Sequence, residues 1–226
     1  MGVVIKGVAS YVPDNVITNF DFEKFLETSD QWIVERTGIR ERRFADPDQA
    51  ASDLGAEAVK RLLERVGWEP EEVELLIAAT SSPDHFFPST ACLIQAKVGL
   101  KNAVPFDVQA GCPGWLFGME IARGMIGAGL YKKAVVVGTE ALSRFLDFKD
   151  RSTCVLFGDG AGAAALEVSE EEGILSSYLG GDGSIGDLLV FPAGGSRLPA
   201  SEETVRRRLH AVKMEGREVF RHAVVM

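Results

Sequence analysis

Cys112 is the residue whose type and setting best suit covalent chemistry. An apolar run at 104–108, typical of a buried strand, leads through Gly111 to this cysteine. Pro113 and Gly114 follow directly and favour the start of a helix. A thiol between the carboxyl end of a strand and the positive end of a helix lies where open α/β sheets build their sites, and the helix end favours the nucleophilic thiolate. The two glycines allow close approach of a substrate and predict N–H donors for an oxyanion hole.

The other two cysteines, Cys92 and Cys154, lie within apolar patterns, and we interpret them as small core residues. Most free cysteines have that role, and only the strand–turn–helix setting distinguishes Cys112 from them. Three cysteines without regular spacing fit neither a disulfide framework nor a zinc site. We therefore expect a reducing compartment, the cytoplasm, and no bound metal.

Composition excludes two classes of partner. A formal net charge of −9 argues against nucleic acid, because neutralising phosphates needs a basic surface. The one basic run, at 206–208, is interpreted as a solvated helix face. No apolar segment reaches the roughly 18 residues that a membrane span requires, so we expect no membrane association.

The elements that must position Cys112 alternate between strands and helices. Apolar patterns predict strands at 3–9, 73–79, 104–108, 134–137 and 162–168. Helices are predicted at 21–26, at 30–37, at 54–66 with Ser52 as its cap, at 90–98, at 115–128, after Ser201, and at 215–226. This alternation predicts parallel strands, right-handed crossovers and a layered α/β domain whose sheet is covered on both faces.

Two segments late in the chain need separate interpretation. The apolar runs at 162–168 and 174–179 lie close enough in sequence to pair as antiparallel strands. The glycine-rich stretch at 158–163 does not fit a dinucleotide fingerprint, which opens a helix after the first strand of its unit. We expect it to provide tight backbone packing beneath the site.

Three groups of residues form longer motifs: 107–114 (DVQAGCPG), 28–33 (TSDQWI) with 36–39 (RTGI), and 150–151 (DR) with 157–163 (FGDGAGA). They resemble segments of the β-ketoacyl-[acyl-carrier-protein] synthase III family of the thiolase superfamily. The first is similar to the family's active-cysteine segment, the second to its amino-terminal coenzyme A signature and the third to its central one. The resemblance extends along nearly the whole chain.

The resemblance implies specific roles for five residues. Cys112 would accept the acyl group, Trp32 and Arg151 would enclose the adenine of coenzyme A, and Thr28 and Arg36 would assist with its phosphates. An indole face and a guanidinium suit a planar base, and arginine also pairs with phosphate. By residue type alone, Trp32 would instead be a core aromatic beneath its helix.

The resemblance also implies an acyl pocket and a fold. Phe87, Leu142 and Leu156 would surround the acyl chain, with Phe87 capping the pocket across a homodimer interface. The fold would be the layered αβαβα arrangement of thiolases. Its first half would be complete at 1–172, and its second half, 173–226, would be truncated.

The family's condensation step also uses a histidine and an asparagine from the carboxyl-terminal half. The histidines here are His85, His210 and His222, and none lies in a segment resembling the family's His-x-Pro-His-Gln-Ala-Asn. We expect structural roles for all three. The helical pattern at 215–226 has no end signal, so we expect this chain to be the amino-terminal two thirds of a family member.

The implied activity is acyl transfer without a cofactor. An acyl-coenzyme A primer, acetyl or a related group, would be condensed with malonyl-acyl carrier protein to begin fatty-acid synthesis. Two alternatives stay open: a sibling of the superfamily, such as a thiolase, a hydroxymethylglutaryl synthase or a type III polyketide synthase, and a noncatalytic fragment that binds an acyl carrier. The tryptophan and arginine signatures favour the first interpretation, whereas the missing histidine and asparagine favour the last.

Overall fold

The computed structural model describes residues 2–225, which form two compact units built from alternating segments of the chain. Unit 1 comprises Met1–Asn15, Arg43–Ala141 and Asp159–Leu179. Unit 2 comprises Val16–Arg42, Leu142–Gly158 and Gly180–Met226. This division reflects packing, and the proposed halves at 1–172 and 173–226 remain a prediction.

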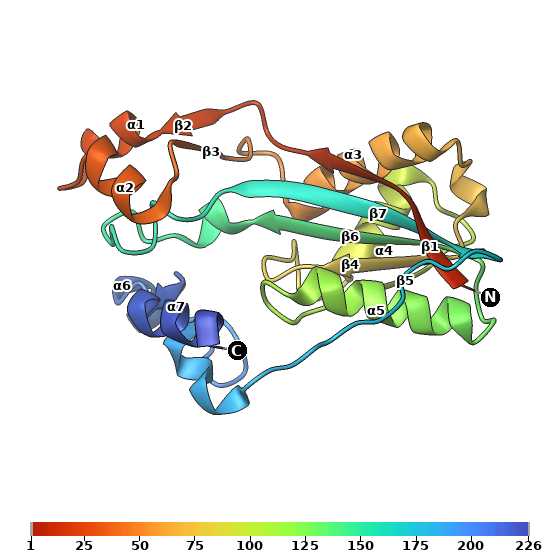
Figure 1. Ribbon diagram of the computed structural model, residues 1–226. Helices are drawn as coiled ribbons and strands as arrows, with labels where there is room; N and C mark the ends of the chain where they lie inside the picture. The colour runs from red at the N-terminus through yellow and green to blue at the C-terminus, as the bar shows by residue number, and fades with distance from the viewer. Residues whose placement is uncertain (1, 226) are drawn as a thin grey trace. The chain divides into compact units, whose positions relative to one another are not determined.

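Unit 1 is built around a five-stranded sheet. Its strands are β1 (Gly2–Tyr11), β4 (Leu75–Ala79), β5 (Val104–Val108), β6 (Lys133–Ala141) and β7 (Asp159–Ser169). They follow the order β1-β7-β6-β4-β5, with β4 parallel to both β5 and β6 (Figure 1). This confirms the predicted parallel pairing. β7 runs antiparallel to β1 and β6, so the whole sheet is mixed.

The predicted pairing of 162–168 with 174–179 is wrong. Both edges of β7 are already occupied, one by β1 and the other by β6. Residues 174–179 form no strand, although the Ile174 N–H donates one hydrogen bond of 2.9 Å to the Val3 carbonyl. β1 therefore occupies the edge of β7 that the short spacing in sequence had suggested for residues 174–179.

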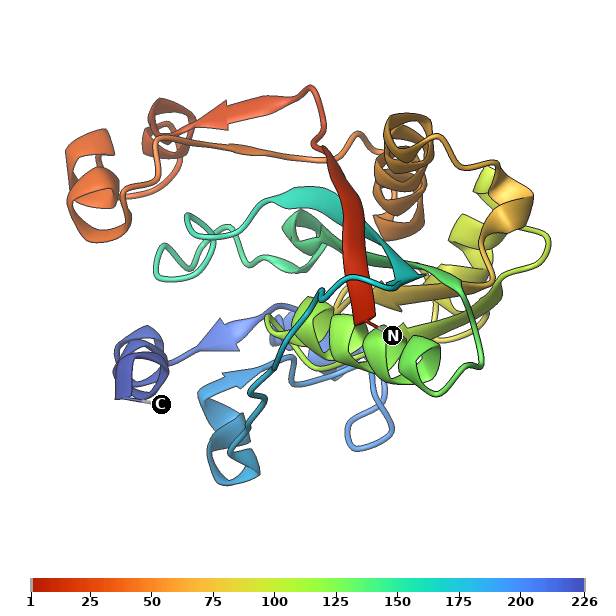
Figure 2. The ribbon, with the colours of Figure 1, turned by 45° about the vertical axis from the view of Figure 1, so that its right-hand side comes forward.

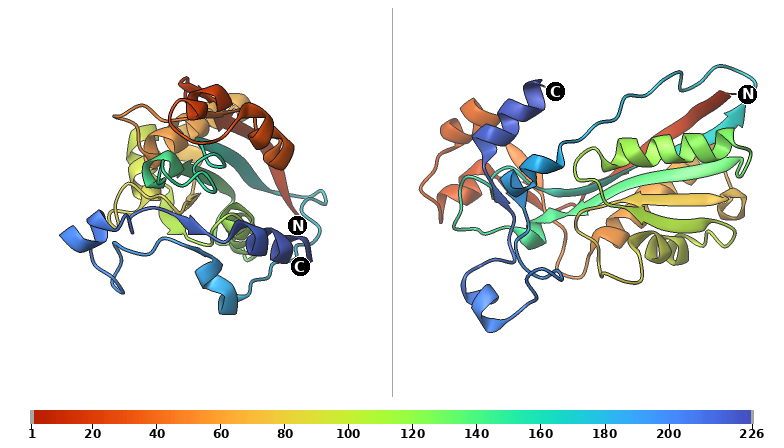
Figure 3. Two further views of the ribbon diagram at one scale, coloured as in Figure 1. Left: turned by 90° about the vertical axis from the view of Figure 1, so that its left-hand side faces the viewer. Right: turned by 90° about the horizontal axis from the view of Figure 1, so that it is seen from below.

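Helices cover both faces of the sheet, as predicted. α3 (Ala51–Val66) and α4 (Thr90–Val98) pack on one face, and α5 (Gly114–Gly127) lies along the other (Figures 1 and 3). A short 3₁₀ turn, η1 (Pro70–Glu72), precedes β4. Each face buries its own apolar cluster, which includes Leu54, Leu62 and Ile94 on the first and Leu75, Ile77 and Leu166 on the second. Burial of this kind contributes about 2 kcal/mol per large side chain.

Ser52 does not cap α3. The N-cap lies two residues earlier, at Ala50, and the Asp53 carboxylate accepts the Ala50 N–H at 2.8 Å. The N–H and hydroxyl of Ser52 instead bind the Asp84 carboxylate, at 2.9 and 2.6 Å. Because Ser52 binds Asp84, it does not cap the helix, although serine is a common N-cap residue.

Unit 2 contains short elements. β2 (Val16–Thr18) is followed by α1 (Asn19–Glu23) and α2 (Asp30–Thr37), and the chain then returns as β3 (Glu41–Arg43), which pairs with β2 (Figure 2). Its remaining elements are η2 (Leu142–Phe145), η3 (Gly183–Leu188), β8 (Leu189–Val190), α6 (Glu202–Arg206), β9 (Lys213–Met214) and α7 (Gly216–Val225). The predicted helices at 30–37 and after Ser201 are confirmed, and Met226, the last residue of the predicted helix at 215–226, lies outside the described residues. Among residues 2–225 no helix has the length and apolarity to cross a membrane.

Candidate active site

Cys112 lies on a tight turn between β5 and α5 in unit 1. Gly111 adopts a left-handed conformation with φ +61°, which favours glycine, and its carbonyl accepts the Gly114 N–H at 2.9 Å. α5 starts at Gly114 with Pro113 at the N-cap. Cys112 is exposed at the turn, so the predicted strand–turn–helix setting is confirmed. A thiol presented in this way is open to attack a carbonyl carbon.

The same hydrogen bond corrects the predicted oxyanion hole. Because the Gly114 N–H closes the turn on Gly111, it is not available to a substrate oxygen. Gly114 has a packing role instead, since a Cβ at this position would lie 3.4 Å from the Cβ of Ala79. The glycine brings the start of α5 close to the end of β4.

A half-buried carboxylate that sequence analysis missed, Glu140, lies near the carboxyl ends of the parallel strands. It accepts the Ser81 N–H at 2.8 Å and the Ser82 hydroxyl in a short hydrogen bond, and Thr80 Oγ1 lies 3.5 Å away. The Ser82 hydroxyl in turn accepts the Ala141 N–H at 2.8 Å. Burial raises the pKa of Glu140, and the donated hydrogen bonds act in the opposite direction. The available signal was a charged residue near the end of a buried strand.

The loop between β4 and α4 carries Phe87 and is held at both ends. Asp84 binds Ser52 as described, and the two oxygens of Asp107 accept the N–H groups of Thr90 and Ala91, each at 2.7 Å. Phe87 itself is 86% exposed. The structure therefore fixes the ends of the loop and leaves its aromatic tip uncovered.

The three predicted acyl-pocket residues are not joined within one unit. Phe87 belongs to unit 1, whereas Leu142 and Leu156 belong to unit 2 and are half-buried. Their grouping as a pocket stays a prediction.

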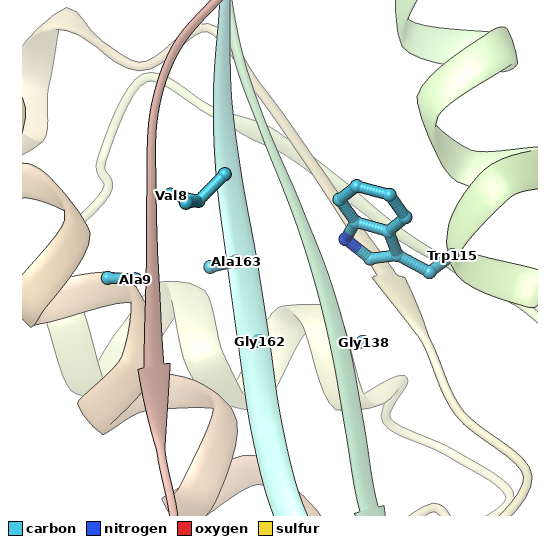
Figure 4. A pocket seen from close by; sticks show the side chains of 6 residues that line it. All are labelled: Val8, Ala9, Trp115, Gly138, Gly162 and Ala163. Carbon is cyan, nitrogen blue, oxygen red and sulfur yellow. The ribbon is translucent and has the colours of Figure 1, made fainter.

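An open apolar hollow of about 280 Å³ lies on the α5 face of the sheet (Figure 4). Its lining residues are Val8, Ala9, Trp115, Gly138, Gly162 and Ala163. Trp115, three residues after the candidate nucleophile, packs against Gly138, where a Cβ would lie 3.3 Å from its ring. The predicted tight packing of the glycine-rich stretch holds at Gly160, where a Cβ would lie 3.3 Å from the Tyr11 carbonyl oxygen, and fails at Gly162, where a Cβ would meet nothing within 4 Å.

Trp32, Arg36 and Arg151, which we call the guanidinium–tryptophan cluster, come together in unit 2. Ser29 caps α2 by accepting the Trp32 N–H at 3.0 Å. The Cζ atoms of Arg36 and Arg151 lie 4.5 and 4.9 Å from the centre of the indole ring. Ile33 is the fully buried residue of this helix turn, whereas Trp32 is half-buried, so the core interpretation of the tryptophan is wrong.

In this structure the Arg151 guanidinium contacts the Trp32 indole directly. A separation of 4.9 Å is a cation–π contact and leaves no space for an intervening ring. One terminal nitrogen of Arg151 also donates a short hydrogen bond to the Glu27 carbonyl. A base could enter between Trp32 and Arg151 only if this guanidinium moved aside.

Thr28 and Arg36 differ in what they offer to a phosphate. Arg36 is exposed. The hydroxyl of Thr28 is buried and has no hydrogen-bond partner within residues 2–225. Of the two, the guanidinium is the group that solvent and ligand reach.

Cys154 fits the predicted core role. It is fully buried, and burial together with the nearby Asp150 raises the pKa of its thiol to about 11. Cys92 is half-buried at the start of α4, where its N–H donates to Ser89 Oγ at 3.2 Å. The residues from 2 to 225 contain no group of ligands that could hold a metal ion.

A family profile and a curated relative both indicate the synthase III family. The family profile described as 3-oxoacyl-[acyl-carrier-protein (ACP)] synthase III matches residues 106–183. The β-ketoacyl-[acyl-carrier-protein] synthase III of Caldanaerobacter subterraneus subsp. tengcongensis is 54% identical over 221 residues, which cover 97% of this chain and 67% of the relative.

Solved structures of the same kind confirm the layered thiolase-like fold. The synthase III crystal structure from Thermus thermophilus is 46% identical with a TM-score of 0.88, covering 98% of this chain and 68% of that one. The structure from Aquifex aeolicus VF5 is 41% identical with a TM-score of 0.86, covering 97% and 67%. The chain therefore spans about two thirds of the length of these proteins.

Proposed function

The chain belongs to the β-ketoacyl-[acyl-carrier-protein] synthase III family, and from that premise we propose that Cys112 accepts the acyl group from coenzyme A. The activity of the family is to condense an acyl-coenzyme A primer with malonyl-acyl carrier protein, which initiates fatty-acid synthesis. The single observation that carries the proposal is the exposed thiol of Cys112 on the turn that opens α5.

In the proposed first step the Cys112 thiolate attacks the thioester carbonyl of the primer. A bond forms between the sulfur and the carbonyl carbon, and the tetrahedral intermediate then expels the coenzyme A thiolate, which takes up a proton from solvent. The products are an acyl-cysteine and free coenzyme A. Acetyl is the proposed primer, because it is the group that the family resemblance implies.

The guanidinium–tryptophan cluster is proposed to bind the adenine nucleotide of coenzyme A. The indole of Trp32 offers a face for the base, and Arg36 and Arg151 supply two positive charges beside it. Since Arg151 now contacts the indole, binding requires its guanidinium to leave the ring and stack on the far side of the base. Its hydrogen bond to Glu27 is the contact that must then shift.

The second step, decarboxylation of the malonyl group, needs donors that stabilise an enolate. The histidines of these 226 residues are His85, His210 and His222, and His210 already lies 2.9 Å from the Thr204 hydroxyl. We therefore propose that this stretch of sequence supports acylation of Cys112 and not, by itself, decarboxylation.

The two half-reactions can be measured separately. Incubation of the purified 226-residue chain with radiolabelled acetyl-coenzyme A should place label on the peptide that contains Cys112. Release of carbon dioxide from malonyl-acyl carrier protein should stay at background. Turnover in the second assay by a preparation of verified mass would mean that one of the three histidines is the missing catalytic group.

A homodimer and a cytoplasmic location are also proposed. β5 is an edge strand with Val104 45% exposed, and an open edge of this kind suits pairing with a second copy. The three cysteines are free thiols, which fits a reducing compartment. Light scattering of the protein at micromolar concentration tests the dimer.

A further inference from the structure

A buried arginine of unit 2, Arg42, connects the two segments that carry Trp32 and Arg151. It lies in β3 with 7% of its surface exposed, and its Cζ atom lies 4.7 Å from the centre of the Phe22 ring. Its Nη1 donates to the Ile17 carbonyl at 3.1 Å, which ties it to β2. A guanidinium at this depth is stabilised by oxygens that accept its N–H groups, and here the two terminal nitrogens find them, whereas the buried Nε–H has no hydrogen-bond partner within residues 2–225.

The other terminal nitrogen, Nη2, reaches two different parts of the unit. It donates to Asn19 Oδ1 and to the Val155 carbonyl, each at 2.9 Å. Asn19 is completely buried and donates through Nδ2 to Asp30 Oδ1 at 2.9 Å and to the Ile39 carbonyl at 2.7 Å. Asp30 is the first residue of α2, so this relay holds the helix that presents Trp32.

The contact with Val155 reaches the segment of Arg151. Residues 150–156 form a series of tight turns, in which the Cys154 N–H donates to the Asp150 carbonyl at 3.1 Å. The Asp150 carboxylate also accepts the Ser152 N–H at 3.0 Å. The Val155 carbonyl is therefore held rigidly relative to the backbone of Arg151.

The chemistry of these contacts requires arginine. Its planar fork places two donor nitrogens at fixed positions, whereas lysine offers one nitrogen on a flexible stem. The three acceptors are neutral oxygens, so the buried charge is solvated by hydrogen bonds at a cost in desolvation. A costly buried group that joins two ligand-binding segments indicates a role beyond packing.

We propose that Arg42 is a positioning residue for coenzyme A: through Asn19 and Val155 it sets the separation between Trp32 and Arg151. The inference rests on the proposed function, because it concerns the same adenine-binding cluster. When the base enters, Arg151 moves at its side chain while the backbone of both segments stays fixed by the Arg42 contacts. The base thus meets two surfaces that are already in place, which reduces the entropy lost on binding.

The hydrogen bond from Asn19 to Asp30 can be tested by exchanging which of the two side chains donates and which accepts. Asn19→Asp keeps an acceptor for Arg42, places two carboxylates together at positions 19 and 30, and removes the donor toward both Asp30 and the Ile39 carbonyl. We expect the dissociation constant of coenzyme A, measured by calorimetry on the whole chain, to rise about tenfold. Asp30→Asn keeps an oxygen for Asn19 and should stay within about twofold of the unchanged chain. In the double variant the amide at position 30 donates to position 19, and affinity should recover to within about threefold.

Two further measurements separate this inference from the function beneath it. Acylation of Cys112 by acetyl-pantetheine, which lacks the adenine nucleotide, should proceed at an unchanged rate in Asn19→Asp. An equal loss of rate with acetyl-pantetheine and acetyl-coenzyme A would overturn the positioning role, because it would reveal general damage to the protein. If Trp32→Ala weakens coenzyme A binding and Asn19→Asp does not, Arg42 has no positioning role and the proposed function stands. If Trp32→Ala also leaves binding unchanged, the adenine-binding proposal falls and this inference falls with it.

Discussion

The nucleophile turn of unit 1 and the guanidinium–tryptophan cluster of unit 2 are held by different kinds of contact. Cys112 is placed by backbone: a strand end, a left-handed glycine and a helix start that are adjacent in sequence. Trp32 and Arg151 are placed by side chains, and the hydrogen bond from Arg151 to Glu27 spans 124 positions of the chain. The first arrangement should tolerate changes in neighbouring side chains, and the second should not.

Replacement of the nucleophile should have the largest effect. We expect Cys112→Ala to lower the rate of acyl transfer from acetyl-coenzyme A by on the order of 10⁴-fold or more, because no other group forms the acyl-enzyme. Single-turnover labelling with radioactive acetyl-coenzyme A measures this rate. Cys92→Ala, on the half-buried α4 position, is the matched control and should retain activity. A labelled protein in the absence of Cys112 would remove the turn from the mechanism.

The second-largest effect should be the difference in thiol reactivity between Cys112 and the other two cysteines. At pH 8 a thiol whose pKa is raised to about 11 is almost entirely protonated, and Cys154 is also buried. Exposed Cys112 should therefore react with iodoacetamide at least about a hundredfold faster, as followed by peptide mapping at short times. Equal reactivity of Cys92 or Cys154 would contradict the special setting of the turn.

Removing either face of the proposed adenine site should have a smaller, substrate-selective effect. Stacking of a base on an aromatic ring contributes about 1–3 kcal/mol, so Trp32→Ala should weaken coenzyme A binding by roughly 10- to 100-fold. Arg151→Ala should act in the same direction and more weakly. Acylation of Cys112 by acetyl-pantetheine, which lacks the adenine nucleotide, should not change.

A matched arginine–aromatic pair in unit 1 provides the control for this prediction. The Cζ atom of Arg61 lies 4.9 Å from the centre of the Tyr11 ring, the same separation as in the Arg151 pair. Arg61→Ala should leave coenzyme A binding unchanged. Equal losses with both substrates in Trp32→Ala would mean that the tryptophan only supports the fold.

The same contrast explains which features could be predicted from sequence. The strand at 104–108 and the helix at 90–98 were predicted with their observed bounds, because apolar periodicity and end signals are local. The run at 174–179 was misassigned because pairing with β7 depended on β1, more than 150 residues earlier. Ser52 failed as a cap for a similar reason, since its partner Asp84 lies 32 positions away.

Within the candidate site, too, sequence predicted the residues with local contacts and missed those whose partners are distant in the chain. Cys112 was found from its neighbours, and the roles of Trp32 and Arg151 came from family resemblance. The buried contacts of Arg42, Asn19 and Glu140 were missed, because a polar residue in a sequence gives no sign of which distant oxygen or N–H it will meet. Such residues are found only once the fold brings their partners together.

Replacement of Glu140 should have the smallest effect, and it limits the contrast between the two units because here unit 1 also depends on hydrogen bonds to a half-buried side chain. Its raised pKa means that the folded protein holds this proton to higher pH than the unfolded chain does. This contribution to the free energy of unfolding is complete below the ordinary value of 4.5 and is lost as pH rises through the raised pKa. Glu140→Gln removes that pH dependence. Ser81 and Ser82 donate to different carboxylate oxygens and an amide has one oxygen, so the variant also loses one of these hydrogen bonds, at a cost of about 1 kcal/mol. Urea unfolding between pH 4 and 7 should therefore show a decline in the free energy of unfolding of the original protein that is shallower in the variant.

Glu64→Gln, on the exposed side of α3, is the control and should keep the original slope. Parallel pH profiles for the original protein and Glu140→Gln would mean that water reaches this carboxylate in the folded protein and that its pKa is not raised.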